Sequence, residues 1–239
     1  MSTLASTNGS IACDHGLRRQ RIVESLSREI VLGAIRPGQH LVTQALADQF
    51  GVSHTPIREG LIALAGMGLV DLKPNRGAVV RRVTATDVRE ICQVRRALEC
   101  EAVRHACGRI DPAELTAIRA DLERLLAVAP PFSPSLIVDA REVDSRLHDR
   151  IAASCGNAFL AKELTRLKTL FRAFRDSAWV HDEARDDYRR VDEEAREHLR
   201  IVDALQANDP RNASRRMSRH IMAGSRYWSR ELPEEATAS

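Results

Sequence analysis

The apolar positions of residues 39–66 recur at helical spacing in two short runs. The first run follows Thr43, a candidate N-cap, and stops at Gly51, a residue that lets the chain turn. The second follows two further candidate caps, Ser53 and Thr55, and has Pro56 in its first turn, where a missing N–H costs nothing. The apolar members are Ala45, Leu46 and Phe50 in the first run, and Ile57, Leu61 and Leu64 in the second. This pattern predicts a helix-turn-helix.

After this pair of helices the apolar spacing becomes alternating. Residues 70–73 alternate apolar and polar, residues 74–77 (Pro-Asn-Arg-Gly) are typical of a tight turn, and residues 78–80 supply a returning strand. The segment therefore predicts a small β-hairpin with Lys73 and Arg76 at its tip. A hairpin in this position makes the fold a winged helix-turn-helix, which is a DNA-binding architecture.

From Thr84 onward the chain reads as consecutive amphipathic helices separated by Pro and Asp. The six predicted helices run from Thr84 to about Gly108, Asp111 to about Ala129, Ser135 to Ser154, Asn157 to Val180, Asp182 to Asn208, and Asp209 to about Arg230. The predicted fold is thus mainly α: an N-terminal winged helix-turn-helix with a small β-hairpin (18–83), followed by an all-α six-helix ligand-binding bundle (84–230). Residues 1–17 and 231–239 are predicted to be flexible tails.

Three of the predicted bundle helices place ligand-type side chains on their apolar stripes. Asp144 and His148 lie one turn apart on one helix, and His198 and His220 lie on the stripes of the last two. A single inward histidine is usually a satisfied core residue. A carboxylate and three imidazoles together form a set suited to a divalent metal, with Zn as the first choice and Ni, Mn or Fe as alternatives.

A buried arginine is the other unusual feature of the bundle. The stripe of the first bundle helix contains Arg95, whose guanidinium needs an anionic partner. Two interpretations remain open: Arg95 binds an anionic ligand, or it forms an internal ion pair with Glu99 or Asp144. Arg96 is the weaker candidate because it falls on the solvent side.

Composition and charge narrow the class of protein. The chain of 239 residues is 44% hydrophobic, has only 4% aromatic residues and carries a net charge of +3. Residues 1–83 hold ten Lys and Arg against six Asp and Glu, which mildly supports nucleic-acid binding by this half. No apolar run could span a bilayer, and the first 17 residues lack a signal-peptide pattern, so we predict a cytoplasmic protein with no membrane partner.

The five cysteines form no CxxC pair, and their number is odd. We interpret them as small buried hydrophobic residues of a reduced compartment, with a redox-sensing thiol as the alternative.

The N-terminal half resembles the DNA-binding domain of the GntR family of bacterial transcription regulators. The resemblance rests on residues 36–38 (Arg-Pro-Gly), 51–53 (Gly-Val-Ser), 55–59 (Thr-Pro-Ile-Arg-Glu) and 75–77 (Asn-Arg-Gly). The chain departs from the family at His54, where Arg is usual, and at Gly60, where Ala is usual. We predict that the residues facing the DNA are Thr43, Gln44, Ser53, His54, Thr55, Arg58, Lys73, Asn75 and Arg76.

The C-terminal half resembles the FCD ligand-binding domain of the FadR subgroup of the same family. The motifs include residues 94–99, Asp144 with Leu147-His148, residues 155–157, Glu197-His198 and Arg219-His220. The resemblance implies a divalent metal at Asp144, His148, His198 and His220, and a small carboxylate effector. The residues expected to bind this effector are Arg95, Arg96 and Asn157.

These observations predict a homodimeric transcription regulator of the repressor type that binds double-stranded operator DNA and responds to a small carboxylate metabolite. One alternative is a metal-dependent hydrolase-like helical domain fused to a DNA reader, since a metal held by three histidines and an aspartate could activate water. Another alternative is an interaction protein with a vestigial wing. Turnover of a bound carboxylate would favour the first alternative, and absence of salt-dependent DNA binding would favour the second.

Overall fold

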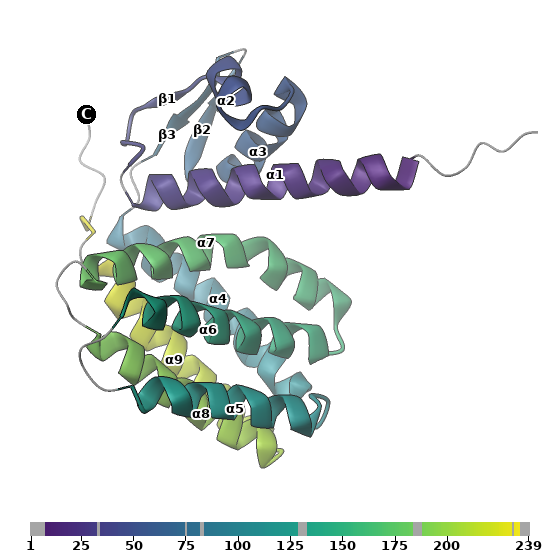
Figure 1. The fold of residues 1–239 in the computed structure, drawn as a ribbon, viewed down its shortest axis with the longest axis vertical. Coiled ribbons are helices and arrows are strands. Elements are labelled where there is room, and N and C mark those ends of the chain that lie inside the picture. Colours follow the sequence, from purple (N-terminus) through teal and green to yellow (C-terminus); the bar gives the residue numbers. More distant parts are fainter. Residues whose placement is uncertain are drawn as a thin grey trace, which may run out of the picture. The chain divides into compact units, whose positions relative to one another are not determined.

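The computed structural model describes residues 8–32, 34–74, 76–81, 84–128, 133–183, 188–230 and 232–234. The chain divides into two compact units (Figure 1). The first comprises Met1–Val83 with Arg172–Phe174 and Ala236–Ser239, and the second comprises Thr84–Phe171 and Arg175–Glu235.

The N-terminal unit is a winged helix-turn-helix, as predicted. Its elements are α1 (Asn8–Val31), β1 (His40–Leu41), α2 (Thr43–Phe50), α3 (His54–Gly66), β2 (Val70–Lys73) and β3 (Gly77–Val80). The predicted hairpin is β2–β3, with Val70 opposite Val80 and Lys73 opposite Gly77. The short strand β1, which the sequence pattern did not indicate, pairs with β3 and completes a three-stranded antiparallel sheet of order β1-β3-β2.

The caps of the two short helices differ from the prediction. Thr43 is the first residue of α2 rather than its N-cap, which is Val42. Ser53 is the N-cap of α3, but its side chain makes no capping hydrogen bond. Gly51 ends α2 in the left-handed region at φ 62°, as its place in the turn requires. The hydroxyl of Ser53 is therefore not used by its own helix.

Helix α1 begins at Asn8, inside the segment that we predicted to be a tail as far as residue 17. The prediction relied on the lack of a charged start and an apolar middle in this segment. No proline interrupts residues 8–31, so a helix that continues through residues 18–31 can extend back through them. Residues 1–7 lie outside the described part of the chain.

The core of the N-terminal unit lies between α1, α3 and the sheet. Ile22 and Leu26 of α1 are fully buried, as are Ile57 and Leu64 of α3. Gly60 lies where the two helices meet: a Cβ atom there would come within 3.0 Å of the Ile22 Cγ2 atom. The departure from Ala at this position therefore reflects close helix packing, as expected for a glycine in a helix interior.

The wing depends on a second glycine. Gly77 has φ +85°, and a Cβ atom on it would lie 2.0 Å from the backbone oxygen of Leu41 in β1. Both its conformation and the close approach of β1 therefore require glycine at the start of β3.

The C-terminal unit is an all-α bundle, as predicted. The described residues form α4 (Ala85–Ala106), α5 (Pro112–Leu126), α6 (Pro134–Ser154), α7 (Ala158–Glu183), α8 (Arg189–Gln206) and α9 (Pro210–Ser229). Helix α4 packs along α9, and α5 packs along α8 (Figure 1). Two predicted caps are confirmed: Thr84 forms a capping box with Asp87, and Asp111 caps α5 ahead of Pro112.

The boundary between α7 and α8 was predicted wrongly. We placed the start of the penultimate helix at Asp182, whereas α7 continues to Glu183 and α8 begins at Arg189. Residues 180–189 contain neither Gly nor Pro, so the local sequence carries no stop signal. No helix in the described part of the chain is long and apolar enough to cross a membrane.

The described cysteines are free thiols, of which Cys92 and Cys155 are buried. Burial raises the pKa of the Cys92, Cys100 and Cys107 thiols, which disfavours the reactive thiolate. These side chains fit the interpretation as small hydrophobic residues. The side chain of Cys13 lies outside the described residues.

Candidate metal centre and nucleic-acid interface

Four ligand-type side chains from three helices meet inside the C-terminal bundle. Asp144 and His148 come from α6, His198 from α8 and His220 from α9. One ligand atom from each lies within 4.8 Å of the ligand atoms of the other three. Asp144, His198 and His220 are buried and His148 is half-buried. The predicted apolar stripes thus bring all four side chains together.

Within this cluster, one oxygen of Asp144 is shared between two imidazoles. Asp144 Oδ1 lies 3.6 Å from His148 Nε2 and 3.5 Å from His198 Nε2. The ring centroids of His198 and His220 are 4.4 Å apart, and that of His148 lies 5.5 and 5.3 Å from them. These separations leave the four ligand atoms close enough to one another to bind a single ion.

The chemistry of the cluster fits a metal. His198 Nε2 is buried and has no hydrogen-bond partner. Burying a polar atom without a partner costs free energy, so such an atom in a native interior calls for an explanation. A metal ion between the four ligands would supply the missing partner.

A buried carboxylate, that of Glu99, and a half-buried one, that of Glu197, hold the outer nitrogens of two of the imidazoles. His148 Nδ1 is bonded to Glu99 Oε2, and His220 Nδ1 lies 3.0 Å from Glu197 Oε2. A carboxylate on one ring nitrogen fixes the tautomer that leaves the other nitrogen as a free acceptor. The two carboxylates therefore direct Nε2 of His148 and of His220 for ligation.

Two buried arginines complete this outer layer. Arg175 of α7 donates to Asp144 Oδ2, which leaves Oδ1 facing the histidines. Arg190 of α8 forms two hydrogen bonds with Glu197, of 3.1 and 3.0 Å. Both arginines are no more than 5% exposed, so these pairs are shielded from water. The charge of Arg175 fixes the orientation of Asp144 directly. The charge of Arg190 fixes the orientation of His220 through Glu197.

The titration of these groups follows from burial and charge. Burial would raise the pKa of Asp144, but Arg175 and the neighbouring histidines hold it well below its usual range. Burial and the nearby imidazoles lower the pKa of His198 and of His220 far below the usual value. The three side chains are therefore in the deprotonated form that binds metal.

Glu194, one turn before His198 on α8, titrates in the opposite direction. It is 3% exposed, its Oε2 has no hydrogen-bond partner, and its nearest cation is Arg190 at 3.6 Å. Burial raises its pKa from 4.5 to about 7, against the attraction of Arg190. Near neutral pH a large fraction of this carboxyl is thus uncharged.

This shift predicts a pH-dependent gain of stability for Glu194→Gln. Below the ordinary pKa of 4.5, Glu194 is protonated in both states and contributes no penalty. As the pH rises from 4.5 to about 7, only the unfolded state releases the proton readily, so stability falls. We expect E194Q to raise the free energy of unfolding by at most about 3 kcal/mol at about pH 8, and to leave it unchanged near pH 4. Urea unfolding of metal-free E194Q and wild-type protein at both pH values measures this difference in the free energy of unfolding. An equal gain at pH 4 and pH 8 would contradict the prediction.

The effector residues predicted from the sequence separate into one buried and two exposed positions. Arg95 is buried and bonds Glu99 Oε1 through Nε at 2.5 Å, so the predicted internal ion pair is formed. Its guanidinium carbon lies 4.9 Å from the Phe171 ring centroid, and Arg95 Nη2 lies 3.4 Å from His148 Nε2. Arg95 therefore borders the metal cluster, but its charge is already matched.

Arg96 and Asn157 do not join the cluster. Both are exposed, and Arg96 follows Arg95 on the outer side of α4. Asn157 Oδ1 accepts a hydrogen bond from the backbone N–H of Leu160 at 3.0 Å, so this side chain caps the start of α7. Cap chemistry explains Asn157 without a ligand.

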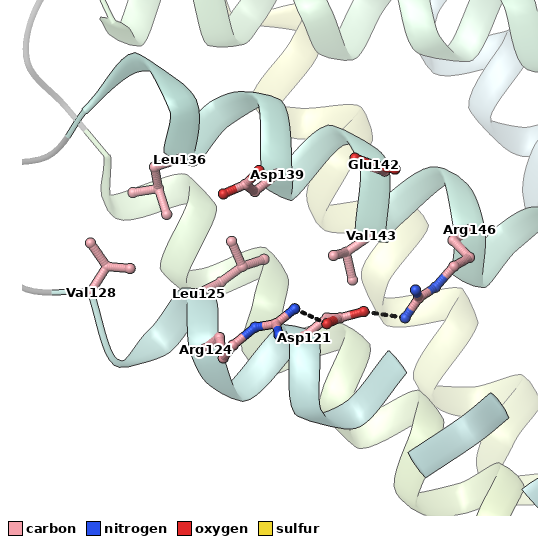
Figure 2. A pocket seen from close by; sticks show the side chains of 9 residues that line it. All are labelled: Asp121, Arg124, Leu125, Val128, Leu136, Asp139, Glu142, Val143 and Arg146. Atoms are coloured by element: carbon pink, nitrogen blue, oxygen red, sulfur yellow. Dashed lines mark hydrogen bonds and ion pairs between the residues drawn. The ribbon is translucent and has the colours of Figure 1, made fainter. Parts of the chain in front are cut away.

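A separate pocket of about 470 Å³ lies between α5 and α6 (Figure 2). Leu125, Leu136 and Val143 line its apolar part, and Asp121 binds Arg124 and Arg146 at one end. None of the four metal-type ligands lines it. This pocket is therefore distinct from the metal cluster.

Most of the residues that we predicted to face DNA are exposed in the N-terminal unit. Ser53, His54, Thr55 and Arg58 are exposed at the start of α3. Thr43 and Gln44 begin α2, and Lys73 and Arg76 flank the turn of the wing, where both are exposed. Asn75 lies outside the described residues. Winged helices contact DNA through the start of the recognition helix and through the wing, where these residues lie. Their contacts with DNA stay a prediction.

Three residues around the metal cluster were missed by the sequence reasoning, namely Arg175, Arg190 and Glu194, and Glu197 was noted only as part of a motif. Glu194 and Arg190 lie four and eight residues before His198, so extending the inward stripe of that helix would have found them. Arg175 gives only a weak signal, as a single charged residue four positions after Phe171.

Comparison with known proteins identifies both halves of the chain. The model for "Bacterial regulatory proteins, gntR family" matches residues 18–80, and the FCD domain model matches residues 90–223. The HTH-type transcriptional repressor RspR of Escherichia coli K12 is 27% identical over 203 residues, covering 84% of this chain and 85% of that protein. The HTH-type transcriptional regulator YdhC of Bacillus subtilis 168 is 27% identical over 197 residues, covering 82% and 84%. The structure of E. coli McbR/YncC is 21% identical with a TM-score of 0.65, over 86% of this chain and 94% of that one, which supports the fold.

Proposed function

Because the chain belongs to the GntR family of bacterial regulatory proteins and carries an FCD domain, we propose that it is a transcription repressor controlled by a small carboxylate bound beside a divalent metal. Its relatives are transcription regulators, and it is a DNA-binding regulator rather than an enzyme. The repressor mode, the bound metal and the carboxylate effector are our proposal.

The observation that carries this proposal is the buried cluster of four ligands with one unsatisfied atom. Asp144, His148, His198 and His220 would hold the ion, and His198 Nε2 has no hydrogen-bond partner. One carboxylate with three imidazoles suits Zn best, while Ni, Mn or Fe would also accept these ligands. A bound ion would supply positive charge and an open coordination position for an anionic group.

The charge balance around the cluster supports an anionic effector. Apart from Glu194, which burial keeps largely uncharged near neutral pH, three carboxylates face three guanidinium groups in the cluster and its outer layer, so their charges cancel. The carboxylates are Asp144, Glu99 and Glu197, and the guanidinium groups belong to Arg95, Arg175 and Arg190. A divalent ion would leave this region with an excess of positive charge. Burying that excess favours an anion, and a carboxylate is a suitable metal ligand.

The DNA-binding halves of two copies of the chain act together. A helix-turn-helix reads two half-sites about one helical turn apart, so two copies of the chain are needed. We propose a homodimer in which the effector shifts the bundle helices that carry the metal ligands, and thereby the spacing of the two recognition helices α3.

A thermal-shift screen of small carboxylic acids on zinc-loaded protein tests the proposal. A compound that binds only the folded protein, at 100 times its Kd, stabilises it by about 2.7 kcal/mol, which raises the melting temperature by on the order of 5–10 °C. We expect the best compound to act only with metal present and to lower operator affinity in a gel-shift assay. Equal shifts in EDTA-treated protein, or turnover of the compound, would contradict the proposal.

A further inference from the structure

Three polar side chains form a chain of hydrogen bonds at the start of the recognition helix. Gln44 Nε2 donates to Asp48 Oδ1 at 2.9 Å, one turn further along α2. Gln44 Oε1 lies 2.7 Å from His54 Nε2, across the turn on the first residue of α3. All three side chains are exposed on the N-terminal unit.

The donors and acceptors in this chain settle which nitrogen of His54 carries hydrogen. A carboxylate only accepts hydrogen bonds, so the amide NH2 group of Gln44 faces Asp48 and its oxygen faces His54. That oxygen in turn needs a donor, so His54 Nε2 bears the hydrogen. In a neutral imidazole the other nitrogen, Nδ1, is then a bare acceptor.

The position of His54 gives this acceptor a target. N-terminal residues of a recognition helix contact base edges in the major groove, and His54 begins α3. In that groove only cytosine and adenine present an amino group as donor, whereas guanine and thymine present acceptors and a methyl group. An imidazole acceptor therefore matches cytosine or adenine.

We propose that His54 reads a base with an exocyclic amino group, cytosine or adenine, and that Gln44 and Asp48 set this preference by fixing the imidazole tautomer. An arginine at this position would instead donate hydrogen bonds, as it does to guanine. The operator of this regulator thus differs from that of relatives with arginine here. The inference concerns base reading alone and does not depend on the metal or the effector.

The test begins with selection of operator DNA from a randomised pool by the wild-type protein at about pH 8, where imidazoles in general are neutral. We then compare affinities for the four bases at the half-site position whose preference changes in His54→Ala. The wild type is expected to prefer cytosine or adenine there by about 2- to 10-fold over guanine, the effect of one neutral hydrogen bond. His54→Ala is expected to remove this preference.

Two relay variants test the role of the neighbours. Gln44→Leu removes the acceptor for Nε2–H, and Asp48→Asn removes the group that orients the amide. Because either tautomer then becomes available, we expect both variants to bind the guanine operator within about 2-fold of the cytosine or adenine operator. His105→Ala, an exposed histidine on α4, serves as the matched control and should keep the full preference.

Three results would overturn the proposal. The first is selection of guanine or thymine at the His54 position, which would mean that His54 acts as a donor or makes no base contact. The second is an equal loss of affinity for all four bases in His54→Ala, which indicates a phosphate contact. The third is full retention of the preference in both relay variants, which would leave the tautomer unfixed by Gln44 and Asp48.

Discussion

Replacing Arg58 by alanine is expected to abolish specific operator binding while leaving the C-terminal unit unaffected. Arg58 is exposed in the second turn of α3, and a long side chain there reaches base edges in the major groove. A bidentate arginine contact contributes about 1–3 kcal/mol of discrimination, and a dimer makes the contact twice. We therefore expect a loss of roughly 30-fold or more in specific affinity. Footprinting and gel shifts on the wild-type operator measure it.

Arg226→Ala supplies the matched control, since it removes the same charge from an exposed position on α9. It should leave operator affinity within about 2-fold of the wild type, because a remote surface charge acts only through the screened field. Melting curves with and without the effector should be the same for R58A and the wild type. A footprint retained in R58A would exclude α3 as the recognition helix.

Replacing both His198 and His220 by alanine is expected to remove the bound metal. The pair supplies two of the four ligands, from two different helices. Loss of one outer-layer partner typically lowers metal affinity by about 10- to 100-fold, and loss of two direct ligands should exceed this. Elemental analysis after dialysis against EDTA and then Zn should find about one ion per wild-type chain and almost none in the double variant. The affinity of the double variant for the carboxylate effector should fall as well.

A single substitution, His198→Gln, guards against misfolding of the double variant, because it keeps a polar side chain of similar size. His105→Ala is the matched control, since His105 is an exposed histidine paired with Glu101 on α4. Only the buried histidines should affect metal content. Full occupancy in the double variant would refute the ligand assignment.

The ligand set of the bundle could be predicted from sequence because it lies on periodic stripes. Asp144 and His148 follow Ile137 and Ala140 at helical intervals, so their inward direction was fixed by the same periodicity that buries the apolar residues. The same periodicity predicted that Arg95 points inward, but it did not decide whether Glu99 or Asp144 is its partner. Only the tertiary arrangement shows that Glu99 is bonded to it directly.

The outer layer of the site could not be predicted because its contacts cross between helices far apart in sequence. Arg175 and Asp144 are 31 residues apart, and His220 and Glu197 are 23 apart. Local periodicity says that such residues face inward but does not pair them. Asn157 shows a different limit: its motif position suggested a ligand contact, which stays a prediction, and did not indicate that the side chain caps a helix.

Elements with weak local signals were also missed. Strand β1 has only two residues and exists because β3 lies beside it. The start of α1 and the boundary between α7 and α8 lie in segments without a proline to mark them. In each case the decisive information is long-range packing or a missing stop signal.

The close approach of α1 to the recognition helix ties together two positions that are far apart in the sequence. A methyl group added at Gly60 would press on Ile22, so a larger residue at position 60 requires a smaller one at position 22. The two sites are therefore expected to co-vary among relatives, with glycine accompanying isoleucine and alanine accompanying a residue without a β-branch. In regulators that follow this rule, the size of the side chain at position 22 of α1 limits which residues the recognition helix α3 can carry at position 60.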